Sequence, residues 1–255
     1  MEIPLLCGFA FLAGFIDAIA GGGGLIQMPA LFLLMPGLQV KDAVTILGTN
    51  KMSSICGTSA ALIQYARHIR IPWTSAGPAA LAAFLFSFLG ALAVSRIPTP
   101  ILRPLVLALL VLVAVYTFWR KDMGAHHKPR FQGRQALLPA AICGGAIGFY
   151  DGFFGPGTGS FLVFIFIGLF GFDFLTASAS AKVINAATNL SALLFFAASG
   201  RIYYAAALPM GLCNVLGALA GAKLAILRGN RFVRPMFLLV VTAMILRYGW
   251  EVLAR

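Results

Sequence analysis

The stretch "GFIDAIAGGGG" at residues 14–24 places an aspartate and four consecutive glycines inside an otherwise apolar run. A second stretch, "GFYDGFFGPGTG" at residues 148–159, repeats the glycine, phenylalanine and aspartate at the same spacing. Glycine costs about 1 kcal/mol and proline about 3 kcal/mol per residue in a helix interior. We therefore expect a helix to break at both stretches.

The runs around these stretches are apolar enough to lie in a bilayer. The chain has 255 residues, of which 60% are hydrophobic and 10% charged, and its mean hydropathy is +0.93. A spanning helix needs roughly 20 apolar residues, and the alternating pattern of membrane β-barrels is absent. The sequence predicts an all-α polytopic membrane protein. Long apolar runs cover residues 3–20, 43–66, 76–95, 101–119, 135–154, 174–198, 203–226 and 232–250, with shorter pieces at 25–36 and 160–172.

The net charge of +12 is carried mostly by lysines and arginines in the short loops between these runs. The positive-inside rule explains such residues, so no nucleic-acid partner is predicted, and the basic loop 120–134 is expected in the cytoplasm. The four cysteines show no CxxC spacing and no nearby histidine cluster, and the spans contain no nucleophile–base pair or HExxH motif. We predict no metal, no cofactor and no enzymatic activity.

An internal duplication aligns the two halves of the chain. At an offset of 134 residues Asp17 lies over Asp151, and at an offset of 131 residues Lys51 lies over Lys182. Such repeats are frequent in secondary transporters. We predict a first repeat over 1–119, the linker 120–134 and a second repeat over 135–255, each with about four helical segments of which the first is broken at its glycine-rich motif.

The orientation of the two repeats depends on the short pieces. Twelve or thirteen helical residues reach only about 18 to 20 Å, less than a hydrocarbon core of about 30 Å. If each short piece folds back as a re-entrant hairpin, each repeat crosses the membrane three times and the repeats are inverted. If it lies near the surface, each repeat crosses four times and the repeats are parallel. Both arrangements give the same distribution of loop charges, and we favour the inverted one.

The predicted substrate site combines charge with free backbone donors. A lysine at the bilayer centre costs at least about 2.5 to 3.5 kcal/mol unless it is compensated, and the N-terminus of a resuming helix suits an anion. We expect an anion site near the membrane midplane between the repeats. Its predicted members are Lys51, Lys182, Thr49, Asn50, Ser53, Gly22, Gly23, Gly24, Gly157, Thr158, Gly159, Ser180, Asn185 and Asn189.

Several structural roles compete with this interpretation. The lysines could extend to the membrane surface or form structural ion pairs with Asp17 and Asp151, and the hydroxyls and amides could join helices. The two aspartates themselves could accept protons for coupling, cap the backbone donors freed by each break, or neutralise the lysines. These alternatives remain open from the residues alone.

The motifs "GFIDAIAGGGGLIQMPAL", "LGTNKMSS", "GFYDGFFGPGTGSF" and "ASAKVINAATN" together resemble the sulfite exporter TauE/SafE family of membrane permeases, over nearly the whole chain. The resemblance implies a bacterial inner-membrane protein that exports small sulfur-containing anions such as sulfite, sulfoacetate or another organosulfonate. The lysine and glycine motifs carry over onto Lys51, Lys182, residues 21–24 and residues 155–159. Asn50 faces Ala181 in the duplication, so the two half-sites are not identical.

From these observations we expect a secondary transporter that works by alternating access, with the lipid bilayer and a small anion as its partners and with proton or ion coupling open. An uncoupled anion channel could use the same glycine breaks and is the alternative. The sequence predicts neither the coupling ion nor the oligomeric state.

Overall fold

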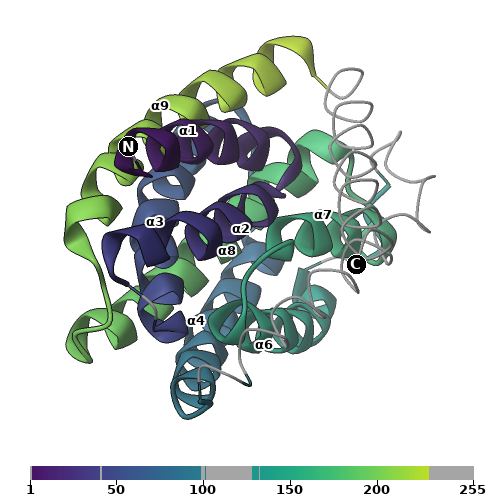
Figure 1. Cartoon of the computed structure of the whole chain (residues 1–255). Coiled ribbons are helices and arrows are strands. Elements are labelled where there is room, and N and C mark those ends of the chain that lie inside the picture. Colours follow the sequence, from purple (N-terminus) through teal and green to yellow (C-terminus); the bar gives the residue numbers. More distant parts are fainter. Residues whose placement is uncertain (1, 41, 99–100, 102–127, 132, 230–255) are drawn as a thin grey trace, which may run out of the picture.

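The computed structural model describes residues 2–40, 42–98, 101, 128–131 and 133–229. Within this part of the chain the regular structure is entirely helical, and the same order of elements occurs twice (Figure 1). The first half contains α1 (Glu2–Ala20), α2 (Gly23–Leu34), the 3-10 turn η1 (Met35–Leu38), α3 (Ala43–His68) and α4 (Trp73–Ser95). The second half contains the 3-10 turn η2 (Gly133–Ala136), α6 (Leu137–Phe153), α7 (Thr158–Gly168), α8 (Phe174–Ala198) and α9 (Tyr204–Arg228).

The predicted all-α membrane fold is confirmed. Five helical segments of the described part are long and apolar enough to span a membrane: α1, α4, η2 with α6, α8 and α9. The pair of segments Gly23–Leu38 and Ala43–His68, bent by 120°, counts as a sixth. The predicted runs 232–250 and 101–119, apart from Ile101, and most of the linker 120–134 lie outside the described residues.

The main helices start in the same way in both halves, because α3 and α8 carry matching N-terminal caps. The backbone N–H of Thr45 donates to the Asp42 carboxylate at 3.0 Å, and that of Thr176 donates to Asp173 at 2.9 Å. An aspartate at this position accepts a hydrogen bond from an N–H that the helix leaves unpaired. The aligned aspartates therefore begin equivalent helices.

Each half packs one of its helices against the other half through glycines. A Cβ atom on Gly90 of α4 would lie 2.2 Å from the carbonyl oxygen of Phe149 in α6, and one on Gly221 of α9 would lie 2.3 Å from that of Phe15 in α1. Small residues allow membrane helices to approach this closely. The two crossings, α4 with α6 and α1 with α9, involve aligned positions of the duplication.

The order of contacts gives the directions of the helices. The start of α3 lies beside the start of α9, where the backbone N–H of Tyr203 donates to Thr49 Oγ1 at 3.0 Å. Further along both helices, Gly57 lies against Asn214. The two helices therefore run in the same direction. Helix α1 also runs with them, because the Tyr65 hydroxyl near the end of α3 donates to the carbonyl of Ala18 near the end of α1, at 2.8 Å.

Helices α3 and α8 run in opposite directions. Arg201, just after α8, forms an ion pair with Asp42 at the start of α3, with 2.9 Å between Nη1 and Oδ2. The carbonyl of Arg201 also lies against Gly48, in the second turn of α3. The end of one helix thus meets the beginning of the other.

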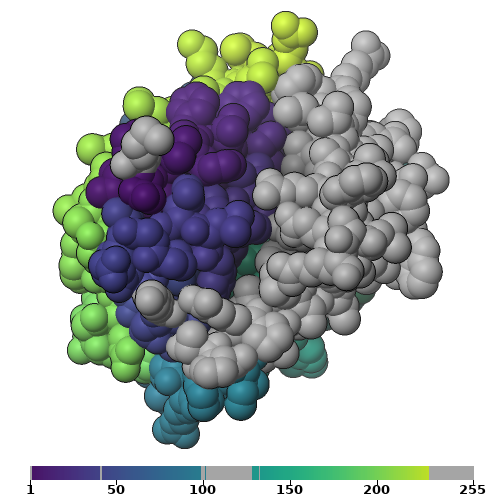
Figure 2. Space-filling model, in the orientation of Figure 1, coloured from purple at the N-terminus to yellow at the C-terminus, as the bar shows by residue number. Residues whose placement is uncertain are grey.

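The outside of the described bundle is apolar, whereas its interior holds much of the polar chemistry. Large hydrophobic side chains such as Leu138, Leu212 and Leu227 are at least 70% exposed, as expected where lipid replaces water. Figure 2 shows one face, on which the side chains of the first helices, purple to blue, lie between green and yellow parts of α9. Both intramembrane lysines are buried.

Candidate anion site between the two halves

The two predicted helix breaks are present in the structure. Helix α1 ends at Ala20, Gly21 has φ +75°, and α2 begins at Gly23. Helix α6 ends at Phe153, and α7 begins at Thr158 after two left-handed glycines, Gly155 and Gly157. Glycine adopts these backbone angles without the steric penalty of a Cβ atom, which explains why the breaks fall at the glycine-rich motifs.

The two breaks touch each other. The backbone N–H of Ser160 in α7 donates to the carbonyl of Gly21 at 2.9 Å, and the Ser160 hydroxyl donates to the carbonyl of Ala20 at 3.1 Å. A Cβ atom on Gly21 would lie 2.4 Å from the carbonyl carbon of Gly159. The polar backbone exposed by the first break is therefore partly satisfied by the second half of the chain.

Lys51 and Lys182 each form an ion pair with the other half. Lys51 Nζ lies 2.7 Å from Asp151 Oδ2, and the two side chains are only 4% and 5% exposed. Lys182 Nζ lies 2.6 Å from Asp17 Oδ2, where the lysine is 1% and the aspartate 21% exposed. The lysine of each half is therefore neutralised by the aspartate that precedes the break in the opposite half.

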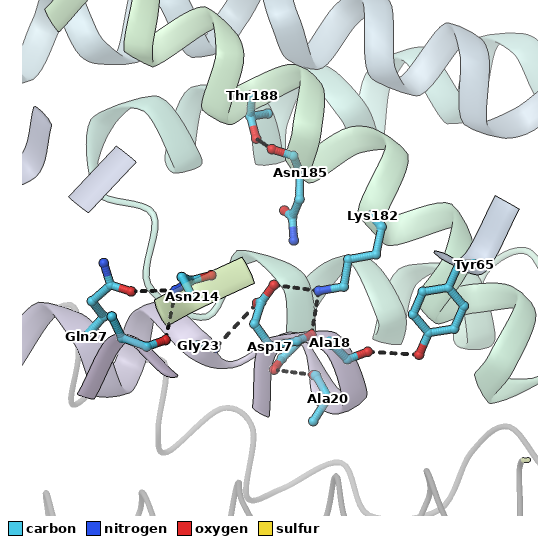
Figure 3. Close-up of polar contacts among 12 residues, drawn as sticks. Asp17, Ala18, Ala20, Gly23, Gln27, Tyr65, Lys182, Asn185, Thr188 and Asn214 are labelled. Carbon is cyan, nitrogen blue, oxygen red and sulfur yellow. Dashed lines mark hydrogen bonds and ion pairs between the residues drawn. The ribbon is translucent and has the colours of Figure 1, made fainter. Parts of the chain in front are cut away.

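Asp17 has two roles at the first break. Its Oδ2 and its backbone carbonyl both accept hydrogen bonds from Lys182 (Figure 3). Its Oδ1 accepts a longer hydrogen bond, 3.4 Å, from the N–H of Gly23 in the first turn of α2. Of the roles left open by the sequence, the structure contains both pairing and capping.

A polar cavity of about 40 Å³ lies between the breaks and the lysine-bearing helices. Such a volume holds a few water molecules, since one water needs roughly 10 to 15 Å³ by this measure. It is lined by Ala13, Asp17, Gly21, Gly23, Gly24, Gln27, Asn50, Lys51, Ser54, Thr58, Asp151, Gly155, Gly157, Thr158, Gly159, Asn185, Asn189 and Asn214.

Helices α3 and α8 contribute matching residues to this lining. Ser54 and Thr58 follow Lys51 by three and seven positions, which places them on one helical face. Asn185 and Asn189 follow Lys182 at the same spacing. In Figure 3 the amide of Asn185 points toward the Asp17–Lys182 pair. Two aligned helix faces therefore meet at one cavity.

The structure brings together most, but not all, of the residues predicted for the site. Thr49 and Ser180 lie away from the cavity, because their hydroxyls donate to carbonyls one turn earlier, those of Thr45 and Thr176. Ser53 is buried beside the cavity-lining Ser54. The predicted residues that line the cavity are Lys51, Asn50, Gly23, Gly24, Gly157, Thr158, Gly159, Asn185 and Asn189, with Asp17 and Asp151; those outside the lining are Thr49, Ser53, Gly22, Ser180 and Lys182.

Sequence reasoning missed Gln27 and Asn214 as site residues. Gln27 is the one long polar side chain in α2, and Asn214 is an isolated amide in the otherwise apolar centre of α9. Isolated amides in membrane helices are costly unless they find partners, and this was the available signal. The searched residues contain no group of three histidines, cysteines, aspartates or glutamates that could hold a metal.

The fold and the cavity define a multi-pass helical membrane protein with a charged site between its two halves. The chain belongs to the sulfite exporter TauE/SafE family, whose family model matches residues 6–248, and it is a membrane transporter of that family. The resemblance of the sequence motifs to this family is thereby confirmed.

Curated bacterial relatives carry matching descriptions. The chain is 36% identical over 249 residues to the "Probable membrane transporter protein YfcA" of Escherichia coli, covering 96% of this chain and 90% of the relative. It is 35% identical over 252 residues to a "Probable membrane transporter protein" of Haemophilus influenzae, covering 97% and 96%. These bacterial sources agree with the predicted inner-membrane localisation. No solved structure matches the chain.

Proposed function

We propose that the protein is a secondary transporter that exports small sulfur-containing anions, such as sulfite, sulfoacetate or another organosulfonate, through the cavity between the two halves. The family name supports the sulfur chemistry. The observation that carries the proposal is that lysines from both halves converge on one buried polar cavity, each held by an aspartate of the opposite half.

The charge balance of the site supports coupled transport. With both lysines and both aspartates ionised, the four groups sum to zero, so an entering oxyanion adds a net negative charge in a low-dielectric region. The anion can be accommodated if it replaces a carboxylate beside a lysine while that carboxylate takes up a proton. Asp17 is the better placed acceptor because it is 21% exposed, whereas Asp151 is 5% exposed.

Backbone donors at the start of α2 and α7 complete the proposed binding site. Gly23, Gly24, Thr158 and Gly159 occupy the first turns of these helices and line the cavity. The first N–H groups of a helix have no partner within the helix and carry a partial positive charge. Two such ends beside one cavity favour an oxyanion there.

The directions of the helices support an inverted arrangement of the two repeats. Helices α1 and α3 begin at one end of the bundle and finish at the other, so α2 returns the chain between them, as expected for a re-entrant hairpin. The aligned helices α3 and α8 run in opposite directions. In transporters built this way, movement of one repeat against the other opens a midplane site alternately to each side.

The test is a binding screen on the purified protein, followed by flux measurements in proteoliposomes. The screen compares sulfite, sulfate, thiosulfate, sulfoacetate and taurine with carboxylate controls. We expect saturable binding of one or more sulfur oxyanions and counterflow exchange in vesicles. Conductance near that of an open pore would identify an uncoupled anion channel instead.

The paired design of the site allows a variant that removes charge without leaving an unpaired one. The double substitution Lys51→Ala with Asp151→Ala should abolish anion flux while the protein still inserts and remains monodisperse. The matched control is Asp42→Ala with Arg201→Ala, which removes another ion pair between the halves, at residues that do not line the cavity. Normal flux in the first double variant would contradict the proposed site.

A further inference from the structure

Gln27 offers the cavity a buried hydrogen-bond donor that the duplication does not explain. Its side chain is 1% exposed and lines the cavity together with Asp17 and Lys51. Its Nε2 atom has no hydrogen-bond partner among the described residues. Buried N–H groups without a partner are rare in folded proteins, so this group indicates a missing acceptor.

The direction in which Gln27 presents its amide is fixed by Asn214. The Nδ2 atom of Asn214 donates to the carbonyl of Ala10 at 3.1 Å and to Gln27 Oε1 at 2.9 Å. Because a backbone carbonyl can only accept, Asn214 must present its amino group at Ala10. The same amino group then requires the oxygen of Gln27, which leaves the Gln27 amino group on the free side (Figure 3).

This donor occurs in one half of the site only. At the offset of 131 residues, Asn214 aligns with Ala83, which has no polar side chain. The surrounding backbone is otherwise alike, since Gly14 lies against the carbonyl of Asn214 and Gly148 lies against the Cα and carbonyl of Ala83. The two half-sites therefore match in their lysines and differ in this amide.

We propose that Gln27 is a specificity-determining residue that donates a hydrogen bond to one oxygen of the bound oxyanion, and that Asn214 is its positioning residue. The inference rests on the proposed anion site. It selects anions that offer one oxygen to a lysine and a second oxygen to Gln27, and it makes the bound anion lie in a single orientation. A monatomic anion cannot satisfy both groups at once.

The test compares Gln27→Met, which keeps the length of the side chain and removes the donor, with the unsubstituted protein. Hydrogen bonds to charged groups are among the stronger ones, so we expect the Kd for sulfite and for sulfate to rise about tenfold or more. The Kd for bromide should change less than twofold. The matched control is Gln64→Met, which makes the same replacement in α3 outside the cavity lining and should leave all three constants unchanged.

A second variant separates ligand contact from a purely structural tie between α2 and α9. Asn214→Ala leaves the donor in place but releases it, so the Kd for sulfite should rise less than in Gln27→Met. The double variant should match Gln27→Met alone, because both changes act on one hydrogen bond. A structural tie would instead lower the thermal stability of each variant and leave the Kd for sulfite unchanged, which would overturn the inference.

The two proposals fail in different ways. If the unsubstituted protein binds no sulfur oxyanion, the proposed function fails and this inference fails with it. If it binds sulfite and Gln27→Met binds sulfite equally well, only the role of Gln27 is overturned.

Discussion

The two ion pairs of the site have the same partners by sequence alignment and different surroundings. The Lys51–Asp151 pair is closed, with both side chains at most 5% exposed, whereas the Asp17 side of the second pair is 21% exposed. Asp17 also caps the start of α2, and the amide of Gln27 lies beside the cavity in the first half only. A duplicated sequence has thus produced one sealed and one accessible half-site.

The largest expected effect comes from removing one charge from the sealed pair. Loss of one partner of a buried ion pair costs about 3 to 5 kcal/mol, because the remaining charge is left without compensation. We expect Asp151→Asn to lose stability on this scale and Asp17→Asn to lose less, since water reaches that pair. Thermal unfolding of the purified variants in the same detergent measures the difference. Equal losses would show that the two pairs are equally buried.

The second prediction compares the two breaks. Alanine at Gly21 would combine left-handed strain with a Cβ atom 2.4 Å from the backbone of Gly159, so we expect a loss of about 2 to 5 kcal/mol. Alanine at Gly155 would meet the mobile end of Lys51 first, at 3.0 Å, and should lose only about 1 to 3 kcal/mol.

Insertion yield and melting temperature report both changes. Gly77→Ala is the matched control, because a Cβ atom there meets nothing within 4 Å. A Gly155→Ala variant less stable than Gly21→Ala would reverse the order that the contacts predict.

The third prediction concerns the crossings where the two halves are alike. Gly90→Ala and Gly221→Ala each place a Cβ atom against a backbone oxygen, at 2.2 and 2.3 Å. Overpacking of this kind costs about 1 to 3 kcal/mol, and the two losses should agree with each other. Gly8→Ala has open space and serves as the control in thermal unfolding. Markedly unequal losses would indicate that the two crossings are not equivalent.

The smallest effect is expected at the Asp42–Arg201 pair outside the spans. Burial alone would raise the pKa of Asp42, but hydrogen bonds from Thr45 and the guanidinium of Arg201 outweigh it and hold the pKa below 3.8, its ordinary value. A carboxyl group with a lowered pKa stabilises the fold above its ordinary pKa, and this contribution is lost as the pH falls through the folded-state value.

Arg201→Ala should therefore cost about 1 kcal/mol or less near neutral pH. The gap in melting temperature from the unsubstituted protein should shrink as the pH falls below the ordinary pKa of 3.8. A gap that widens in acid would contradict this assignment of charge.

Much of the fold could be predicted from the sequence because bilayer thickness and glycine conformation act locally. The run predicted at 174–198 is α8 over Phe174–Ala198, and both predicted breaks are present. The intramembrane lysines could be predicted as site residues from the cost of an unpaired charge in lipid. These inferences require only the residues of one segment.

The partners within the site could not be predicted because they come from distant segments. Lys182 and Asp17 are 165 positions apart, and Asn214 and Gln27 are 187 positions apart. Composition said that a buried charge or amide needs a partner, but several candidates were available in each half. Thr49 illustrates the converse, since its hydroxyl holds the start of α9 rather than the cavity.

The exchange of counter-charges between the halves has a consequence for biogenesis. Lys51 enters the membrane during synthesis a hundred residues before Asp151 exists. Until the second half is inserted, the nascent chain must keep this ammonium group beside Asp17, near the headgroups or within the translocation channel. A premature stop in the linker would therefore leave a half-protein with a mismatched charge in lipid, a natural signal for membrane quality-control proteases.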